Sequence, residues 1–515
     1  MMSTSRIIGS MVAPTRKKSM VASHHQNEIT NGNSNSHSHS HSPPKTNAKI
    51  VKAQQERKRL SSVIVEDGIE YNKKARKVHK EIFDHPDTIQ SAGSNSDTEA
   101  PLFDPDCDPD HPKKVTYPEI SSAAFVIKNG VQRTPCPRSL QLSQKFEMDL
   151  YFKKEYLQVT GSFKERGARY ALSRLNADQK SHGVIAASAG NHALALSYHG
   201  QQMGIPVTVV MPVIAPLMKI QFCRSLGANV ILKGETILIA KEYALKHAAE
   251  NHLKYINGYD AVDILAGQGT IGSEILEQVP DVDAILVPVG GGGLIAGIAV
   301  AVKTVKPDVK IYGIEAETCP SFSEALKAGK PIGVTNRSSV ADGLAVPTVG
   351  GNSLVTAESL VDKMILVNEE SIALSILRLM EVEKAVVEGG GAVGLAAILS
   401  DKVPELKGKK VVSILSGGNI DTTVLGRSIE RGLAVDGRLV RLEVVVSDRP
   451  GGIAELTTTL AHLGASIKDI FHERAWISAD VFSVKVKVVI ETRGRDHVQE
   501  IEEALKKIYS NVALM

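Results

Sequence analysis

A single lysine stands in a tight, glycine-bounded turn whose composition suits nucleophilic chemistry. The turn spans residues 160–167 and reads Thr-Gly-Ser-Phe-Lys-Glu-Arg-Gly before a helical pattern begins. Ser162 and Glu165 have the spacing of a capping box, which predicts a helix start here. Lys164 then lies in the first helical turn, where the helix dipole and the charge of Arg166 disfavour an ammonium group. We expect a lysine of lowered pKa that can form a Schiff base with an aldehyde cofactor or a carbonyl substrate. Taken alone, the turn also fits a solvated lysine on a surface helix.

Three glycine-rich turns follow apolar strand patterns and suit the binding of anions. They are Ser188-Ala-Gly-Asn191-His192, Gly290-Gly-Gly-Gly293-Leu294 and Ser416-Gly-Gly-Asn419. In a parallel sheet all three lie at the carboxyl edge, where open α/β sheets bind ligands. The first two also begin helices, whose free N–H groups favour anions, and four successive glycines let the backbone wrap a phosphate closely. Two anion sites and one activated lysine indicate a phosphate-bearing cofactor and a carboxylate substrate.

The second glycine turn also fits another class of cofactor. Gly291-x-Gly293-x-x-Ala296 follows a strand, begins a helix and precedes a strand that ends in Glu315, as in a dinucleotide-binding fingerprint. A nicotinamide or flavin enzyme would leave the lysine turn and the other two glycine turns without a role. A pyridoxal phosphate enzyme uses all of them, because it needs a lysine, a phosphate loop and a pocket for the substrate carboxylate.

The elements that position these turns alternate between strand and helix from about residue 115 onward. Strands are predicted at 149–153, 184–187, 207–211, 230–232, 284–289, 310–315 and 410–415, and helices at 120–127, 192–203, 217–226 and 294–305. This alternation predicts an α/β fold with a parallel sheet covered by helices on both faces.

Near residue 436 the pattern changes to a smaller α+β unit. Strands are predicted at 439–446, 465–471 and 481–490, with helices at 453–463 and 497–508. This βαββα order suits a ferredoxin-like fold. We therefore divide the chain into a tail (1–100), a catalytic domain (101–435) and a regulatory domain (436–515).

The first 100 residues have the composition of a disordered tail. They contain Asn/Ser runs, a Ser–His alternation from His37 to His41 and few apolar residues to offset the entropy of ordering. The first 27 residues lack acidic side chains and carry four basic ones, so a mitochondrial transit peptide is an alternative to a plain tail.

The overall composition excludes several classes of protein. A net charge of +3 over 515 residues gives no general case for nucleic-acid binding. Four widely spaced cysteines indicate a reducing compartment rather than a disulfide framework or a zinc site. No apolar run approaches the ~20 residues that span a bilayer. We expect a cytoplasmic protein, with a mitochondrial location as the alternative, that contacts neither membrane nor nucleic acid.

Residues from about 115 to 430 resemble the fold-type II pyridoxal phosphate enzymes, in particular the group of threonine/serine dehydratases (ammonia-lyases) and serine racemases. The resemblance rests on the lysine turn, on Ser188-Ala-Gly-Asn-His-Ala193, on Val289-Gly-Gly-Gly-Gly-Leu-Ile-Ala-Gly297, and on the segments beginning at Gln268 and Ser416. The segment Asp448-Arg-Pro-Gly-Gly-Ile-Ala-Glu455 resembles an ACT domain.

The resemblance implies a catalytic domain of two parallel-sheet α/β subdomains, and it implies roles for the residues of these motifs. Lys164 is the expected catalytic residue: it holds pyridoxal 5'-phosphate through a Schiff base and then acts as the base at the substrate Cα. The cofactor-binding residues are expected to be Phe163, Lys164, Asn191, Gly290, Gly291, Gly292, Gly293, Leu294 and Ser416; alternatively, Phe163 is an ordinary core residue. The substrate carboxylate is expected to bind, mostly through backbone N–H groups, at Ser188, Ala189, Asn191 and His192; alternatively, His192 caps its helix.

Two positions favour elimination over related reactions. Ser416 is expected to face the pyridine nitrogen, and a neutral hydroxyl cannot hold that nitrogen protonated, which favours rapid loss of water over transamination. The racemases of this group have a serine where this chain has Ala189, and a methyl group cannot donate a proton to the opposite face of the substrate. The implied reaction is therefore β-elimination from L-threonine or L-serine, with release of ammonia and a 2-oxo acid.

Two other functions also fit the motifs. The alternatives are a serine racemase with side elimination, and an amino-acid sensor with an idle catalytic site. ACT domains usually bind amino acids where two copies meet, here near Arg449–Gly452, so a homodimer or homotetramer with an amino-acid effector is expected.

The dehydratase and racemase group often has a cation site after the strand that ends here at Glu315. In this chain Cys319 and Ser321 replace the expected acidic ligand, and no metal is predicted.

Overall fold

The computed structural model describes residues 104–476 and 480–515. The predicted tail at 1–100, with its transit-peptide alternative, lies outside the described residues. Among the described helices, none is long and apolar enough to cross a membrane.

The larger of two parallel sheets has five strands in the order β1-β9-β6-β7-β8. Their bounds are β1 Asp149–Lys154, β6 Ala284–Pro288, β7 Lys310–Ala316, β8 Lys363–Val367 and β9 Lys410–Leu415. Every neighbouring pair is parallel. All five residues of the central strand β6 are buried, as expected for a parallel strand covered on both faces.

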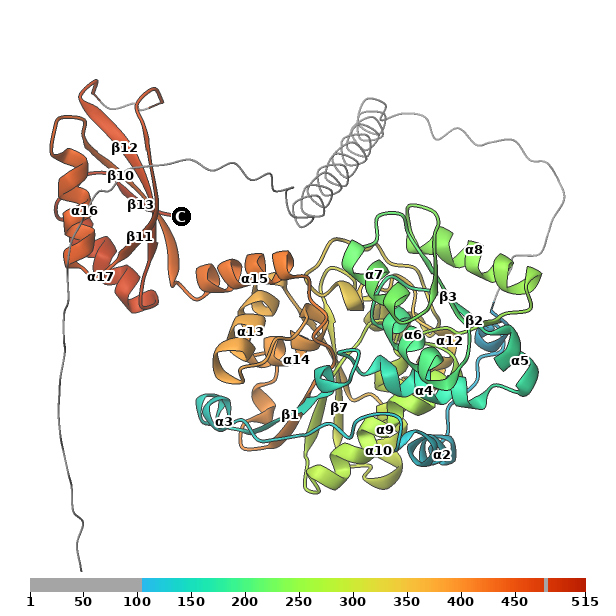
Figure 1. The fold of residues 1–515 in the computed structure, drawn as a ribbon. Helices are drawn as coiled ribbons and strands as arrows, with labels where there is room; N and C mark the ends of the chain where they lie inside the picture. Colours follow the sequence, from blue (N-terminus) through green and yellow to red (C-terminus); the bar gives the residue numbers. More distant parts are fainter. Residues whose placement is uncertain (1–103, 477–479) are drawn as a thin grey trace, which may run out of the picture. The chain divides into compact units, whose positions relative to one another are not determined.

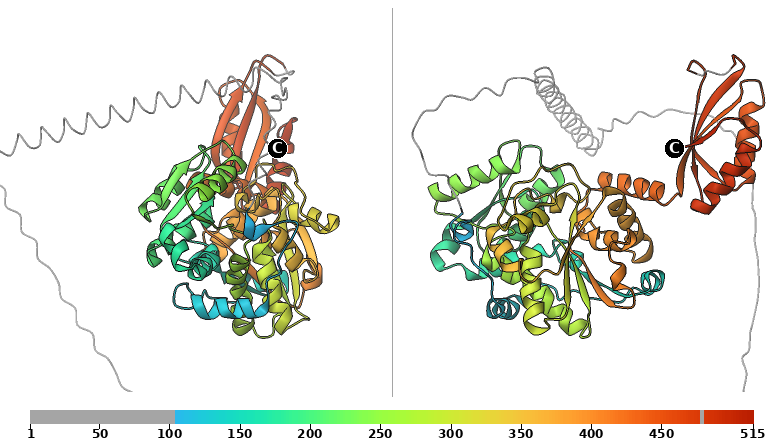
Figure 2. Two further views of the ribbon diagram at one scale, coloured as in Figure 1. Left: turned by 90° about the vertical axis from the view of Figure 1, so that its right-hand side faces the viewer. Right: turned by 180° about the vertical axis from the view of Figure 1, so that it is seen from behind.

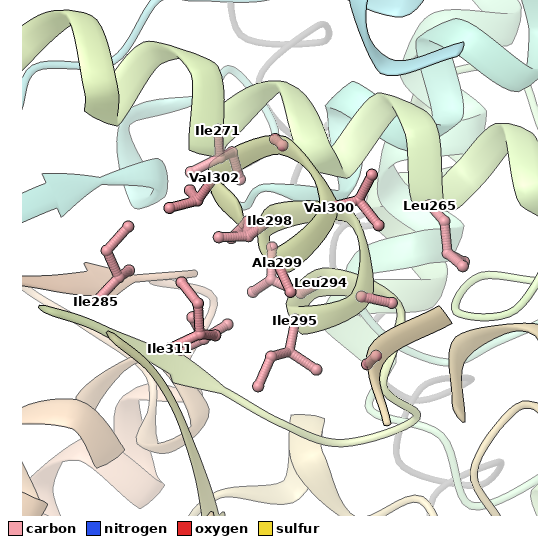
Figure 3. Close-up of a cluster of buried hydrophobic side chains, with 14 of the residues drawn as sticks. Leu265, Ile271, Ile285, Leu294, Ile295, Ile298, Ala299, Val300, Val302 and Ile311 are labelled. Atoms are coloured by element: carbon pink, nitrogen blue, oxygen red, sulfur yellow. The ribbon is translucent and has the colours of Figure 1, made fainter. Parts of the chain in front are cut away.

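Helices cover both faces of this sheet (Figure 1). One face packs against α2 (Tyr117–Ile127), α9 (Val262–Gln278) and α10 (Gly293–Val305), and the other against α13 (Glu369–Val382) and α14 (Gly389–Leu399). Figure 3 shows side chains of α9 and α10 packed against Ile285 of β6 and Ile311 of β7. A Cβ added to Gly297 of α10 would lie 2.3 Å from the carbonyl oxygen of Leu265 in α9, so glycine permits this close helix packing.

A second parallel sheet has four strands in the order β4-β3-β2-β5. Its strands are β2 Val184–Ala187, β3 Val207–Met211, β4 Asn229–Leu232 and β5 Lys254–Tyr255. Its helices are α4 Lys164–Arg174, α5 Ala177–His182, α6 Asn191–Met203, α7 Leu217–Ser225 and α8 Ile237–Glu250. Helices α4, α6 and α7 pack against one core cluster and α8 against another on the opposite face. The predicted α/β class with two parallel-sheet subdomains is confirmed.

The remaining elements of this part are short. They are η1 Pro105–Cys107, α3 Leu140–Phe146, η2 Glu155–Leu157, α11 Ser321–Ala328, η3 Asp342–Leu344, α12 Gly351–Ala357 and η4 Pro404–Leu406.

The C-terminal unit is a four-stranded antiparallel sheet with two helices. Its elements are β10 Leu439–Ser447, α16 Gly452–His462, β11 Ser466–Glu473, β12 Ser483–Glu491, α17 Arg495–Lys506 and β13 Val512–Leu514. The strand order is β11-β12-β10-β13. Alternate residues of β12 are buried, so one face of the sheet carries the core shared with α16 and α17 (Figures 1 and 2). The ferredoxin-like prediction is confirmed, and the three-residue β13 is an addition to it.

The junction between the two units is one helix and a short turn. Helix α15 runs from Thr422 to Val435, and β10 begins at Leu439. The division at residue 435 stays a prediction.

Candidate active site

The lysine turn is joined by hydrogen bonds to the third glycine turn. The backbone N–H of Phe163 donates to the carbonyl oxygen of Ser416 at 3.0 Å, and the N–H of Gly418 donates to that of Gly161 at 2.9 Å. Lys164 is the first residue of α4 and therefore lies in its first turn, as predicted. The predicted capping box is wrong, because the carboxylate of Glu165 accepts from the N–H of Thr160 and no side chain caps the helix.

Lys164 is partly buried, and a hydrogen bond holds its amine in place. Its Nζ donates to the carbonyl oxygen of Gly258 at 2.5 Å and lies 5.0 Å from the centre of the Phe163 ring. Loss of hydration lowers the pKa of Lys164 to about 8, while the negative charge of Glu388 acts in the opposite direction. The predicted direction is therefore confirmed. Burial is the largest cause of the shift, and Arg166 is not among the charges that act on Lys164.

Arg166 has little influence on Lys164 because its charge is matched behind the turn. The fully buried guanidinium donates to both carboxylate oxygens of Glu155 at 2.8 Å and to Glu274 at 2.7 and 2.9 Å. Lys153 donates to the same Glu274 at 2.5 Å. Two cations and two carboxylates thus form a compact, neutral network that anchors the start of α4.

The side chain of Asn191 connects the first and third glycine turns. Its Nδ2 donates to Oε1 of Glu388 at 2.8 Å, and its Oδ1 accepts from Nδ2 of Asn419 at 2.9 Å. Asn419 also donates to the carbonyl oxygen of Thr160 at 2.7 Å, which brings in the lysine turn. The structure therefore gathers three of the predicted motifs around one amide.

Sequence reasoning missed Glu388. Burial raises the pKa of this carboxyl to about 7, with Asp342 adding to the rise and Lys219 opposing it. The available signal was a fourth glycine run, Glu388-Gly-Gly-Gly391, at the start of α14.

The ring of His192 faces the segment from Ile256 to Gly258. Its Nε2 lies 3.0 Å from the carbonyl oxygen of Ile256, and its ring packs against Gly258. Burial lowers the pKa of His192 to about 3, so the ring is neutral and its Nε2–H donates to that carbonyl. Only the backbone N–H of His192 remains for the predicted role, and the helix-capping alternative is wrong. Ser188 accepts from the N–H of Gly190 at 3.3 Å, and Ala189 is partly buried beside it.

Neighbouring residues pack so closely against the four-glycine loop that its positions have no room for a side chain. An added Cβ at Gly291 would lie 2.3 Å from the ring of Tyr259, and one at Gly293 would lie 2.4 Å from the carbonyl oxygen of Tyr259. Gly292 has a φ of +95°, and its Cβ would meet the ring of Phe322. The loop ends at the N-terminus of α10, where backbone N–H groups are free to bind an anion.

Replacing Gly291 with alanine is expected to raise the dissociation constant of pyridoxal phosphate at least about 10-fold, because the added Cβ displaces the loop from Tyr259. Equilibrium titration of the apoprotein with the cofactor measures this. The control is Gly426→Ala, since a Cβ at this position of α15 meets nothing within 4 Å. An unchanged constant for Gly291→Ala would mean that the loop conformation does not control cofactor affinity.

The remaining predicted cofactor residues lie around the same loops. Ser416 is buried, Leu294 belongs to the core beneath α10, and Phe163 packs against that core. A lysine amine of lowered pKa, a glycine cradle at a helix start and a fixed asparagine amide form a donor set that fits a phosphorylated aldehyde such as pyridoxal phosphate.

Glu315 has a structural partner that excludes the dinucleotide interpretation. Its carboxylate accepts from the N–H of Phe322 at 2.7 Å, and from the N–H and hydroxyl of Ser323 at 3.0 and 2.6 Å. The acid is thus committed to the start of α11 and cannot bind a ribose. Within residues 104–476 and 480–515, no three His, Cys, Asp or Glu side chains are grouped to hold a metal ion.

Comparisons with known proteins agree with this donor set. A family model described as pyridoxal-phosphate dependent enzyme matches residues 127–417, and an ACT domain model matches residues 440–508. The L-threonine ammonia-lyase of Thermotoga maritima is 43% identical over 391 residues, covering 76% of this chain and 97% of that protein. The protein of the same name from Geobacter sulfurreducens is 41% identical over 392 residues, again covering 76% and 97%.

Solved structures show the same fold in the catalytic part. The processed form of threonine deaminase isoform 2 from Solanum lycopersicum has a TM-score of 0.59 and 34% identity, covering 62% of this chain and 95% of that one. Maize serine racemase has a TM-score of 0.59 and 33% identity, covering 62% and 98%. Matches of this extent show that the chain belongs to the pyridoxal-phosphate dependent enzymes of fold type II and that an ACT domain follows in the same chain.

Proposed function

We propose that the protein is an L-threonine/L-serine ammonia-lyase. It converts L-threonine to 2-oxobutanoate and ammonia, and L-serine to pyruvate and ammonia. The observation that carries this proposal is the amine of Lys164, which has a lowered pKa and is held by the Gly258 carbonyl. The next residue, Tyr259, packs against the glycine loop at Gly291 and Gly293. The two relatives above, at 41–43% identity over nearly their whole length, carry the L-threonine ammonia-lyase name.

The binding residues divide into two groups. Gly290 to Gly293, with the N–H of Leu294, hold the cofactor phosphate, since their loop ends at a helix N-terminus. When the cofactor is bound, Asn191 would donate to its phenolic oxygen, Phe163 would pack on its ring and Ser416 would face its ring nitrogen. Backbone N–H groups of residues 188–192, at the start of α6, bind the substrate carboxylate.

Proton transfer is assigned to Lys164. When bound, pyridoxal phosphate supplies an electron sink that makes the Cα–H bond of the substrate acidic. The Nζ of Lys164 takes the Cα proton and then protonates the β-hydroxyl, which leaves as water. The released enamine takes up one water and yields the 2-oxo acid and ammonia.

Ala189 supports elimination rather than racemisation. Racemisation requires a second proton donor on the face of the substrate opposite Lys164, and a methyl group cannot serve. The likeness to serine racemase is structural, at 33% identity. A racemase with side elimination is therefore the second candidate, and an idle sensor is disfavoured because it has no need of an activated lysine.

Purified protein is expected to release 2-oxobutanoate from L-threonine and pyruvate from L-serine, and to form D-serine far more slowly than pyruvate. A panel of L-Thr, L-Ser and D-Ser with chiral product analysis measures this. Ala189→Ser is expected to raise the ratio of D-serine to pyruvate, because a hydroxyl replaces the methyl group. D-serine appearing as fast as pyruvate in the unaltered protein would favour the racemase, and a cofactor absorption band without oxo-acid formation would contradict the lyase.

The ACT domain is proposed to bind an amino-acid effector and to join copies of the chain in a homodimer or homotetramer. The turn at Arg449–Gly452 leads into α16, and Gly451 there has a φ of +105°. Running the substrate panel with and without isoleucine and valine tests this regulation.

The proposed compartment is a reducing one, such as the cytoplasm. All four cysteines of the chain are unpaired, which supports this proposal: Cys107, Cys136, Cys223 and Cys319.

A further inference from the structure

We infer that Glu388 is a positioning residue: by accepting a hydrogen bond from the amide of Asn191, it fixes that amide as an N–H donor towards the bound cofactor. The inference requires only that pyridoxal phosphate binds, and it does not depend on which substrate the enzyme uses.

The hydrogen bonds around Asn191 leave its amide a single orientation. The carboxylate of Glu388 accepts from Nδ2, and the Nδ2 group of Asn419 can only donate, so it selects Oδ1. A flipped amide would place oxygen against oxygen at Glu388 and N–H against N–H at Asn419. One N–H of Nδ2 is committed to Glu388, and the second is the one available to the phenolic oxygen.

Glu388 is placed for this contact rather than for capping its own helix. It occupies the N-cap position of α14, yet its side chain makes no capping hydrogen bond. The side chain extends instead across Gly417, where an added Cβ would lie 2.3 Å from Oε1 of Glu388. The backbone N–H of Glu388 donates to the carbonyl oxygen of Gly417 at 3.0 Å, which fixes the two segments together. Glycine at position 417 thus provides the space through which the carboxylate reaches Asn191.

The charges around Glu388 make its protonation sensitive to pH near neutrality. Lys219 of α7 and Lys164 of α4 favour the carboxylate, whereas Asp342 of η3 and burial favour the acid. Asn191 and the backbone N–H of Asn419 donate to it and also favour the carboxylate. Since the pKa of Glu388 is raised to about 7, the ionised, acceptor-only form predominates above neutral pH. Below it, a carboxylic acid can turn its O–H towards Asn191 and weaken the fixed orientation.

A double-mutant cycle on cofactor affinity tests the inference without any substrate. Glu388→Ala and Asn191→Ala are each expected to raise the dissociation constant of pyridoxal phosphate about 10-fold, and the double variant is expected to match Asn191→Ala alone. This result follows if Glu388 acts through Asn191. Effects that multiply to about 100-fold would overturn the inference, as would a Glu388→Ala protein that binds the cofactor normally.

Glu388→Gln tests the charge of Glu388 while keeping its packing. It also replaces Glu388→Ala as the test if the alanine variant does not fold. Glutamine keeps an acceptor oxygen and similar volume but cannot ionise. The absorption of the bound cofactor, followed from pH 6 to 8, is expected to show a transition near pH 7 in the unaltered protein and none in this variant. The matched control is Glu370→Gln on α13, where the glutamate is exposed. An identical transition in Glu388→Gln and in the unaltered protein would refute the role of Glu388.

Discussion

Lys164→Ala is expected to reduce the release of 2-oxobutanoate from L-threonine by at least about 10³-fold, because it removes both the attachment point of the cofactor and the base at Cα. The visible absorption of the bound cofactor is expected to disappear as well. Lys246→Ala, which removes an exposed lysine of α8, is the control and should retain both properties. Oxo-acid release at an undiminished rate by the Lys164 variant would show that another group performs the proton transfer.

The lowered pKa of Lys164 gives this prediction a second readout. An amine attacks an aldehyde only in its neutral form, and burial brings the pKa of Lys164 to about 8 from an ordinary 10.5. Covalent capture of pyridoxal phosphate by the apoprotein should therefore become faster as the pH rises through about 8 and then level off. Stopped-flow absorbance from pH 6.5 to 10 measures this profile. A rate that still rises steeply above pH 10 would indicate a lysine of ordinary pKa.

Lys164 shows what local sequence could and could not predict. The turn, the helix start and the direction of the pKa shift followed from neighbouring residues. The largest cause, burial, did not, because it depends on distant parts of the chain: the carbonyl that accepts from Nζ belongs to Gly258, 94 positions away. The capping box failed for a related reason: the backbone of Ser162 forms a bridge with Gly417 of the third glycine turn, and Glu165 bonds to Thr160 instead.

Glu388 and His192 show the same limit at the site itself. The glycine turns follow parallel strands and so mark the carboxyl edge where ligands bind, which made the neighbourhood of the site predictable. The hydrogen bond from Asn191 to Glu388 joins residues 197 positions apart, and no local pattern identifies such a partner. His192 belongs to a predicted motif, yet its ring bonds to the carbonyl oxygen of Ile256. Nothing in the sequence indicated that these two residues are neighbours.

Replacing Arg166 with methionine is expected to destabilise the catalytic part by about 3–5 kcal/mol, since it leaves a buried carboxylate without its partner. Although burial alone raises the pKa of Glu155, the Arg166 guanidinium keeps that pKa below its ordinary value. Without the guanidinium, Glu155 must take up a proton or remain buried as an unpaired charge. The midpoint of urea unfolding, followed by the fluorescence of the bound cofactor, measures the loss.

The ion-pair network of Arg166 also predicts that a second substitution restores part of the lost stability. In the double variant Arg166→Met with Glu155→Gln, only Lys153 and Glu274 keep their charges, and these two remain paired at 2.5 Å. Because the unpaired charge is gone, the double variant is expected to recover more than half of the stability lost by Arg166→Met. Arg174→Met, on the same helix, is the control: its contact with Asp263 is exposed and 3.7 Å long, so its loss costs at most about 1 kcal/mol. A double variant less stable than Arg166→Met would mean that hydrogen bonds of Glu155, rather than charge balance, hold the lysine turn in place.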